Sequence, residues 1–166
     1  RDLVAHIYDI TRGLICSEDT LVVVDDSIVR GTTLRESIIT SLSQLNPKRI
    51  VIVSSAPPIM YPDCYGIDMS QIGKFIAFEA AIELTREQGN EALLDEIAQN
   101  CTEQLRLPVD MMKNEVKKLY DQFTLEQISR KIAELVLPND LAWQGSLDVV
   151  YQDIEGLNAS MPDYSG

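Results

Sequence analysis

The residues best suited to chemistry lie in one stretch of the chain, residues 22–33. Two adjacent carboxylates, Asp25 and Asp26, end an apolar run, and a loop with Gly31 and two threonines follows. Carboxylates accept hydrogen bonds from sugar hydroxyls or hold a hard cation such as Mg²⁺, whereas backbone N–H groups at the start of a helix hold a phosphate. The spacing suits a ligand that carries a vicinal diol and a phosphate on one small ring. No side chain of the stretch is an obvious nucleophile or essential base, so no catalytic residue is assigned.

The flanking patterns predict the elements that position this loop. Residues 20–24 form a β-branched apolar run without alternation, the pattern of a strand buried on both faces, and residues 49–55 form a second one. Between them, residues 34–45 have helical spacing, with Thr32 or Thr33 as the cap. This order predicts a βαβ unit with parallel strands. The carboxylates then stand at the carboxyl end of a strand, where open α/β sheets bind ligands.

Beyond residue 73 the apolar residues recur at helical spacing. We expect Met111 and Met112 to belong to the core, together with Cys16 and Cys101. Four helices are predicted, over residues 75–84 with a stop at Gly89, 93–105 with a stop at Pro108, 109–120, and 124–138 with Thr124 and Gln127 as a capping box. A further helix is expected over residues 3–10. The chain is divided into residues 1–72, which carry the loop, a helical extension over 73–145, and a loop or tail over 146–166.

Composition and charge exclude several classes of protein. The 166 residues are 45% hydrophobic and 24% charged, as in a globular chain. The longest apolar runs are far shorter than the ~20 residues of a membrane span. The net charge of -12 argues against nonspecific binding to nucleic acid or to anionic membranes. Three cysteines without a CxxC pair indicate neither a disulfide framework nor a zinc knuckle. We therefore expect a cytoplasmic protein without a nucleic-acid or membrane partner.

Residues 22–33 resemble the phosphoribosyl pyrophosphate (PRPP) motif of the type I phosphoribosyltransferases. Residues 24–33, which read VDDSIVRGTT, are closer still to the glutamine phosphoribosylpyrophosphate amidotransferase (amidophosphoribosyltransferase) family, which opens purine biosynthesis. A second segment, residues 54–69 with the sequence SSAPPIMYPDCYGIDM, resembles the next segment of that family. The resemblance covers residues 18–69. It implies an α/β chain with a partial parallel-sheet type I phosphoribosyltransferase fold, Rossmann-like, followed by a helical C-terminal region.

The resemblance also implies a role for each residue of the loop. Asp25 and Asp26 would hold the ribose 2- and 3-hydroxyls and the Mg²⁺ that accompanies the pyrophosphate of PRPP. The 5-phosphate would be wrapped by the main-chain amides of Ser27, Ile28, Val29, Arg30, Gly31, Thr32 and Thr33. The side-chain hydroxyls of Thr32 and Thr33 would add two donors. Ammonia derived from glutamine would attack the anomeric carbon and release pyrophosphate, giving 5-phosphoribosylamine. For the Arg30 side chain, contact with a phosphate and exposure to solvent both stay open.

The sequence also departs from the family pattern. The chain starts at Arg1, directly in an amphipathic pattern, so we expect a piece of a longer protein. The N-terminal glutaminase domain of the family, the upstream strands and the pyrophosphate loop are expected to be missing, and this fragment alone to be inactive. Some family members hold an iron–sulfur cluster. Here Cys64 lies one place off a ligand position and three cysteines cannot supply four thiolates, so we expect no cluster. The full-length enzyme is expected to be a homo-oligomer.

Three other interpretations stay open at this point. The chain could be another type I phosphoribosyltransferase, such as a nucleobase salvage enzyme. It could be a non-catalytic module that senses PRPP or a nucleotide. Residues 73–166 could be an interaction surface or a lid on the sheet, and a contiguous exposed apolar patch would favour the interaction surface.

Overall fold

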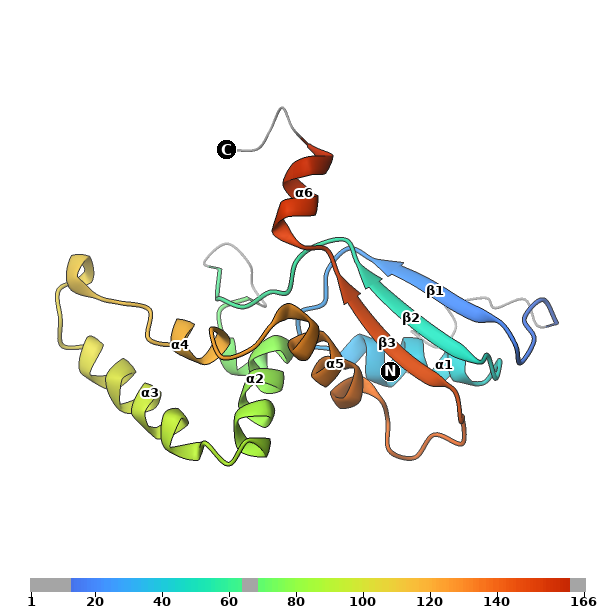
Figure 1. Cartoon of the computed structure of the whole chain (residues 1–166), viewed down its shortest axis with the longest axis horizontal. Helices are drawn as coiled ribbons and strands as arrows, with labels where there is room; N and C mark the ends of the chain where they lie inside the picture. The colour runs from blue at the N-terminus through green and yellow to red at the C-terminus, as the bar shows by residue number, and fades with distance from the viewer. Residues whose placement is uncertain (1–12, 64–68, 162–166) are drawn as a thin grey trace.

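The computed structural model describes residues 13–63 and 69–161. Three strands, β1 (Thr20–Asp25), β2 (Arg49–Ser54) and β3 (Ser146–Tyr151), form one parallel sheet in the order β1-β2-β3 (Figure 1). The helices are η2 (Leu34–Ile38), α1 (Ile39–Ser43), η3 (Ile72–Lys74), α2 (Ile76–Glu87), α3 (Glu91–Gln104), η4 (Val109–Met111), α4 (Lys117–Tyr120), α5 (Leu125–Val136) and α6 (Ile154–Ser160). The predicted class, α/β with a parallel sheet and a helical C-terminal region, is confirmed.

The βαβ unit forms as predicted. Residues 20–25 pair in parallel with residues 49–54, and the helical segment between them begins directly after Thr33. Its first part, η2, is a wider π-helical turn that continues into α1. Thr33 occupies the N-cap position, but its side chain makes no capping hydrogen bond. The Thr33 hydroxyl, a predicted cap of this helix, is therefore available to the pocket above the helix.

The prediction that residues 20–24 are buried on both faces is wrong. One face of the sheet carries Ile50 and Ile52, which are fully buried beneath the helices. On the opposite face Val22 is 62% exposed and Val24 is 70% exposed. A continuous apolar run shows that both faces can be covered, but it cannot show that a second layer is present. Among the described residues, helices pack closely on one face only.

Residues 146–151 form a strand, so the expected loop or tail over 146–166 is wrong for this segment. β3 pairs with β2 over its whole length. Leu147, Val149 and Tyr151 face the same side as the buried isoleucines of β2, while Ser146 is exposed. This alternation with period 2 was visible in the sequence. β3 gives β2 the second neighbour that a central strand requires.

Three of the four predicted C-terminal helices form, and the remaining one does not. α2 ends at Glu87, and Gly89 shortly after it has a φ of 69°, the left-handed conformation of a helix stop. α5 begins at the predicted capping box, in which the backbone N–H of Gln127 donates to Thr124 Oγ1 at 3.2 Å. The helix expected over 109–120 is only a 3₁₀ turn and the short α4. Met112 is extended, with ψ 141°, and interrupts the ladder between them.

The turn between α3 and α4 is exposed, so Met111 and Met112 are not core residues. Leu105 is 78% exposed and Val109 is 84% exposed in the same turn, at the end of the molecule away from the sheet (Figure 1). Several exposed apolar side chains thus occur together along this one turn of the helical region. Cys16 is exposed as well, because it lies in the polar turn before β1; Cys101 is half-buried against the core.

Some predictions fall outside the described residues. They are the helix over 3–10, Cys64, and residues 65–68 of the second motif. Within residues 13–63 and 69–161, every helix is too short or too polar to cross a membrane.

Tyr151 offers a test of the packing of β3. Its side chain is buried, and the burial raises the pKa of its hydroxyl, which has no hydrogen-bond partner within the described residues. We expect Tyr151→Phe to raise the free energy of unfolding by about 1 kcal/mol, because it removes an unsatisfied polar group. The matched control is Tyr120→Phe, since the Tyr120 hydroxyl donates to the Met60 carbonyl at 2.9 Å. Chemical denaturation should show a higher free energy of unfolding for Tyr151→Phe and a lower one for Tyr120→Phe. A loss of stability in Tyr151→Phe would contradict the prediction.

Candidate functional site

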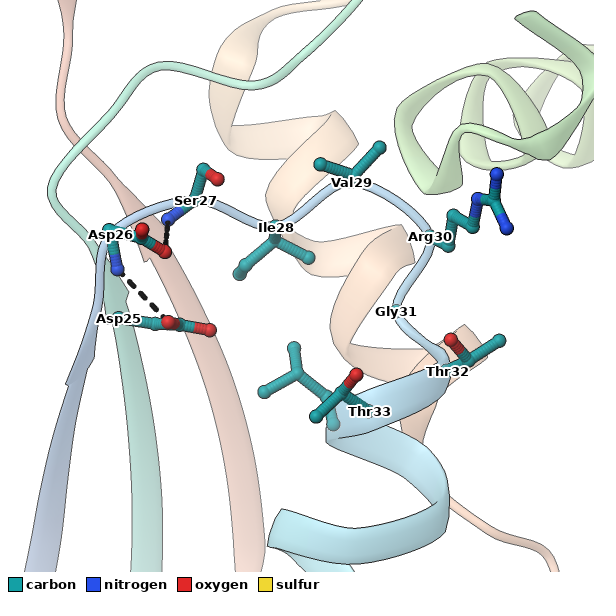
Figure 2. Close-up of a pocket in the computed structure, with 10 residues that line it drawn as sticks. Asp25, Asp26, Ser27, Ile28, Val29, Arg30, Gly31, Thr32 and Thr33 are labelled. Atoms are coloured by element: carbon teal, nitrogen blue, oxygen red, sulfur yellow. Dashed lines mark hydrogen bonds between the residues drawn. The ribbon is translucent and has the colours of Figure 1, made fainter. Parts of the chain in front are cut away.

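The loop at residues 25–33 leaves the carboxyl end of β1 and encloses a pocket. The chain arches from Asp25 over Ile28 to Gly31 and then enters the helix, with the Asp25 carboxylate and the Thr33 side chain on the inside of the arch (Figure 2). The pocket has a volume of about 410 Å³ and is lined by residues 25–34. The residues that the sequence singled out thus line one pocket, brought together by one short loop.

The two carboxylates hold the start of the loop and keep oxygen atoms available. The backbone N–H of Asp26 donates to Asp25 Oδ1 at 3.0 Å, and that of Ser27 donates to Asp26 Oδ1 at 2.7 Å. Asp25 is half-buried and Asp26 is exposed. The backbone N–H of Ser55 donates to the Asp25 carbonyl at 2.9 Å, which ties the loop to the end of β2. Each carboxylate therefore keeps one oxygen without a hydrogen bond to the described residues.

This donor set is compatible with Mg²⁺. The described residues contain no group of three or more His, Cys, Asp or Glu that could hold a metal ion by themselves. Mg²⁺ often takes only one or two carboxylates and completes its shell with substrate phosphates and water. Asp25 and Asp26 each keep one oxygen, which matches the number of carboxylates that such a magnesium ion would take from the protein.

The far end of the loop presents backbone donors. The N–H groups of Gly31, Thr32 and Thr33 have no hydrogen-bond partner among the residues that the structure describes. The backbone N–H of Arg35 donates to the Gly31 carbonyl at 3.0 Å and begins the helix. Unpaired amides at a helix start favour an anion, and the exposed hydroxyls of Thr32 and Thr33 add donors.

The Arg30 side chain is directed away from the carboxylates. It is half-buried and extends toward α2, on the opposite side of the loop from Asp25 (Figure 2). In this arrangement the side chain lies outside the arch (Figure 2).

Residues far away in the sequence hold the back of the loop, and sequence reasoning missed them. The backbone N–H of Ile76 donates to the Val29 carbonyl at 2.8 Å. A methyl group on Gly31 would lie 2.9 Å from Val136 Cγ1 and 3.2 Å from Ile76 Cγ1. The guanidinium of Arg35 donates to the Leu135 carbonyl. No local pattern indicates these contacts, because the partners belong to α2 and α5.

The described part of the second motif connects β2 to this helical region. The Ser54 hydroxyl donates to the Ala56 carbonyl at 2.8 Å as the strand ends. Tyr61 packs edge-on against Tyr120 of α4, with ring centroids 5.5 Å apart and an interplanar angle of 81°. The segment thus packs against helices beyond residue 75.

Comparisons with known proteins agree with the resemblance seen in the loop. No protein-family model matches the chain. It is similar to the amidophosphoribosyltransferase of Escherichia coli strain K12, with 39% identity over 70 residues, 42% of this chain and 14% of the relative. It is 36% identical to that of Haemophilus influenzae over 91 residues, 54% and 18% of the two chains. It is 43% identical to that of Bacillus subtilis strain 168 over 68 residues, which are 41% of this chain and 14% of the relative. The chain thus spans less than a fifth of the length of these relatives.

Proposed function

We propose that the loop at residues 25–33 binds the ribose 5-phosphate part of PRPP, and that the chain is this part of the catalytic domain of an amidophosphoribosyltransferase. One observation carries the proposal: two carboxylates with available oxygens and three unpaired backbone N–H groups line a single pocket at the carboxyl end of β1. The relatives named above support the choice of reaction, and they favour it over nucleobase salvage.

In this proposal the loop binds and orients the sugar. Asp25 and Asp26 accept hydrogen bonds from the 2- and 3-hydroxyls and hold Mg²⁺, while residues 27–33 hold the 5-phosphate. Ammonia forms the new C–N bond at the anomeric carbon as the bond to the pyrophosphate oxygen breaks, and pyrophosphate leaves with the electron pair. Mg²⁺, when bound, would neutralise charge on the pyrophosphate. The carboxylates stabilise the positive charge that develops on the ribose ring, so positioning and electrostatics are the contribution of the loop.

The activity of the whole protein extends the same proposal. A glutaminase domain of the same chain would supply the ammonia, and the complete enzyme would be a cytoplasmic homo-oligomer that makes 5-phosphoribosylamine, the first step of purine biosynthesis. The 166 residues assayed by themselves should release no pyrophosphate with glutamine and PRPP. Release of pyrophosphate in that assay would contradict this part of the proposal.

Asp25→Asn tests the proposed site. In a backbone-amide NMR titration with ribose 5-phosphate and Mg²⁺, we expect shifts confined to residues 25–33. The substitution should weaken the affinity about tenfold, because it replaces a charge-assisted acceptor. This ligand needs only the loop and no pyrophosphate site.

The control is Asp19→Asn, which changes another carboxylate at the opposite end of β1, where it accepts from the Cys16 N–H at 2.8 Å. Its affinity for ribose 5-phosphate should equal that of the wild type. A well-dispersed spectrum that does not change on titration would refute the proposed site. Binding of PRPP without turnover by the complete enzyme would favour a sensing module instead.

A further inference from the structure

We propose that two helix ends hold the phosphate loop in its binding shape. They are the first turn of α2 and the last turn of α5, and their contacting residues Ile76, Leu135 and Val136 are called the helix bracket below. None of the three belongs to the pocket lining, so they act through the loop as positioning residues. The bracket lies beyond residues 18–69, which carry the resemblance. Its effect on ligand affinity rests on the proposed function, but its effect on the loop does not.

The first contact fixes a peptide plane in the loop. The backbone N–H of Ile76 is one of the first N–H groups of α2, which have no partner inside their own helix. It donates to the Val29 carbonyl at 2.8 Å. Because the peptide group is planar, the direction of this carbonyl fixes the orientation of the peptide bond that follows Val29. α2 thus determines how the chain enters the phosphate-facing part of the loop.

The second contact fixes the position of Gly31. Its backbone lies so close to the helices that an added methyl group would be 2.9 Å from Val136 Cγ1 and 3.2 Å from Ile76 Cγ1. Its φ of 68° turns the chain sharply into η2 at the same point. The two side chains therefore form the surface against which the loop backbone rests, and their shape determines where the following amides lie.

The third contact joins the helix after the loop to the end of α5. The Arg35 guanidinium donates to the Leu135 carbonyl, in the last turn of α5. Carbonyls there have no partner inside the helix and lie at the negative end of its dipole, so a cation is favoured. The bracket thus contacts the chain before, at and after the unpaired amides of Gly31, Thr32 and Thr33.

Val136→Ala tests the bracket because it removes Cγ1, the Val136 methyl group that lies against Gly31. The first readout is the set of backbone amide resonances of residues 29–33 without ligand, which should move. The second is the affinity for ribose 5-phosphate with Mg²⁺, which should weaken by about fivefold. Ile97→Ala is the matched control, because Ile97 is buried in α3, away from the loop (Figure 1). It should lower stability while leaving both readouts at their wild-type values.

A conservative variant keeps the test decisive if Val136→Ala does not fold. Ile76→Val removes Cδ1, which lies 3.3 Å from the position of a Gly31 methyl group, and it should move the same resonances by less. Three results would each overturn the bracket. The resonances of residues 29–33 could stay unchanged in the variants that fold, or they could move equally in Ile97→Ala. They could also move in the bracket variants while the affinity stays unchanged. If the resonances move but the wild type binds no ribose 5-phosphate, the bracket stands and the proposed function fails.

Discussion

Gly31→Ala should reduce the affinity for ribose 5-phosphate by about a hundredfold and lower the free energy of unfolding by about 2–5 kcal/mol. Two costs add. The φ of 68° is unfavourable for alanine by about 1–2 kcal/mol. The new methyl group would also lie 2.9 Å from Val136 Cγ1, and such overpacking costs typically ~1–3 kcal/mol. The loop must leave its position to relieve the clash, and the unpaired amides move with it.

Gly89→Ala separates the two costs of this substitution. Gly89 has a similar φ of 69°, but nothing lies within 4 Å of an added methyl group. Alanine there should cost only the backbone strain, about 1–2 kcal/mol, and leave the affinity unchanged. In the double variant Gly31→Ala with Val136→Ala the contact at 2.9 Å is removed while those with Ile76 stay, so the stability should recover in part. Equal stability losses in Gly31→Ala and Gly89→Ala would show that the helices do not crowd the loop. The measurements are chemical denaturation and the ribose 5-phosphate titration.

Trp143→Ala should lower the free energy of unfolding by about 3–5 kcal/mol. Trp143 is 9% exposed, and its indole N–H donates to the Pro47 carbonyl at 2.7 Å across 96 residues of sequence. Gly145 packs directly on the ring, since an added methyl group would lie 2.3 Å from it. The side chain thus joins the segment that leads into β3 to the turn that leads into β2. Its removal leaves a cavity and an unpaired carbonyl together.

Trp143→Phe is the control for this cavity. It keeps most of the buried apolar surface, because a phenyl ring replaces the larger indole, and it loses the indole N–H with its hydrogen bond, so about 1–2 kcal/mol of destabilisation is expected. Far-UV circular dichroism is the suitable signal for denaturation, because the chain has a single tryptophan and both variants lack it. A loss below about 1 kcal/mol in Trp143→Ala would contradict the packing of this segment.

These contacts change how the helical region is understood. Its division from the rest of the chain at residues 72 and 145 stays a prediction. The structure adds that α2 and α5 support the loop, and that β3 follows them into the sheet. The exposed turn around Leu105 and Val109 is the part of this region farthest from the sheet.

The sequence by itself determined the local elements and the chemistry of the loop. Residues 20–25, the helix after Thr33 and residues 49–54 could be predicted because period and composition act over a few neighbouring residues. The capping box at Thr124 was equally local, because both partners lie within one turn. The carboxylates and the glycine-threonine loop lie in one short connection between a strand and a helix. Because they are neighbours in the sequence, their proximity in the structure could be predicted.

Only the tertiary structure decided what surrounds these elements. The exposure of Val22 and the contact of Gly31 with Val136 both depend on segments distant in the chain. An apolar run has the same sequence pattern whether one or both faces of the strand are covered. A glycine in the sequence likewise does not show whether it lies in an open turn or against a helix. Position along the chain fixes short-range geometry, whereas burial depends on which surfaces meet, and that is a property of the folded chain as a whole.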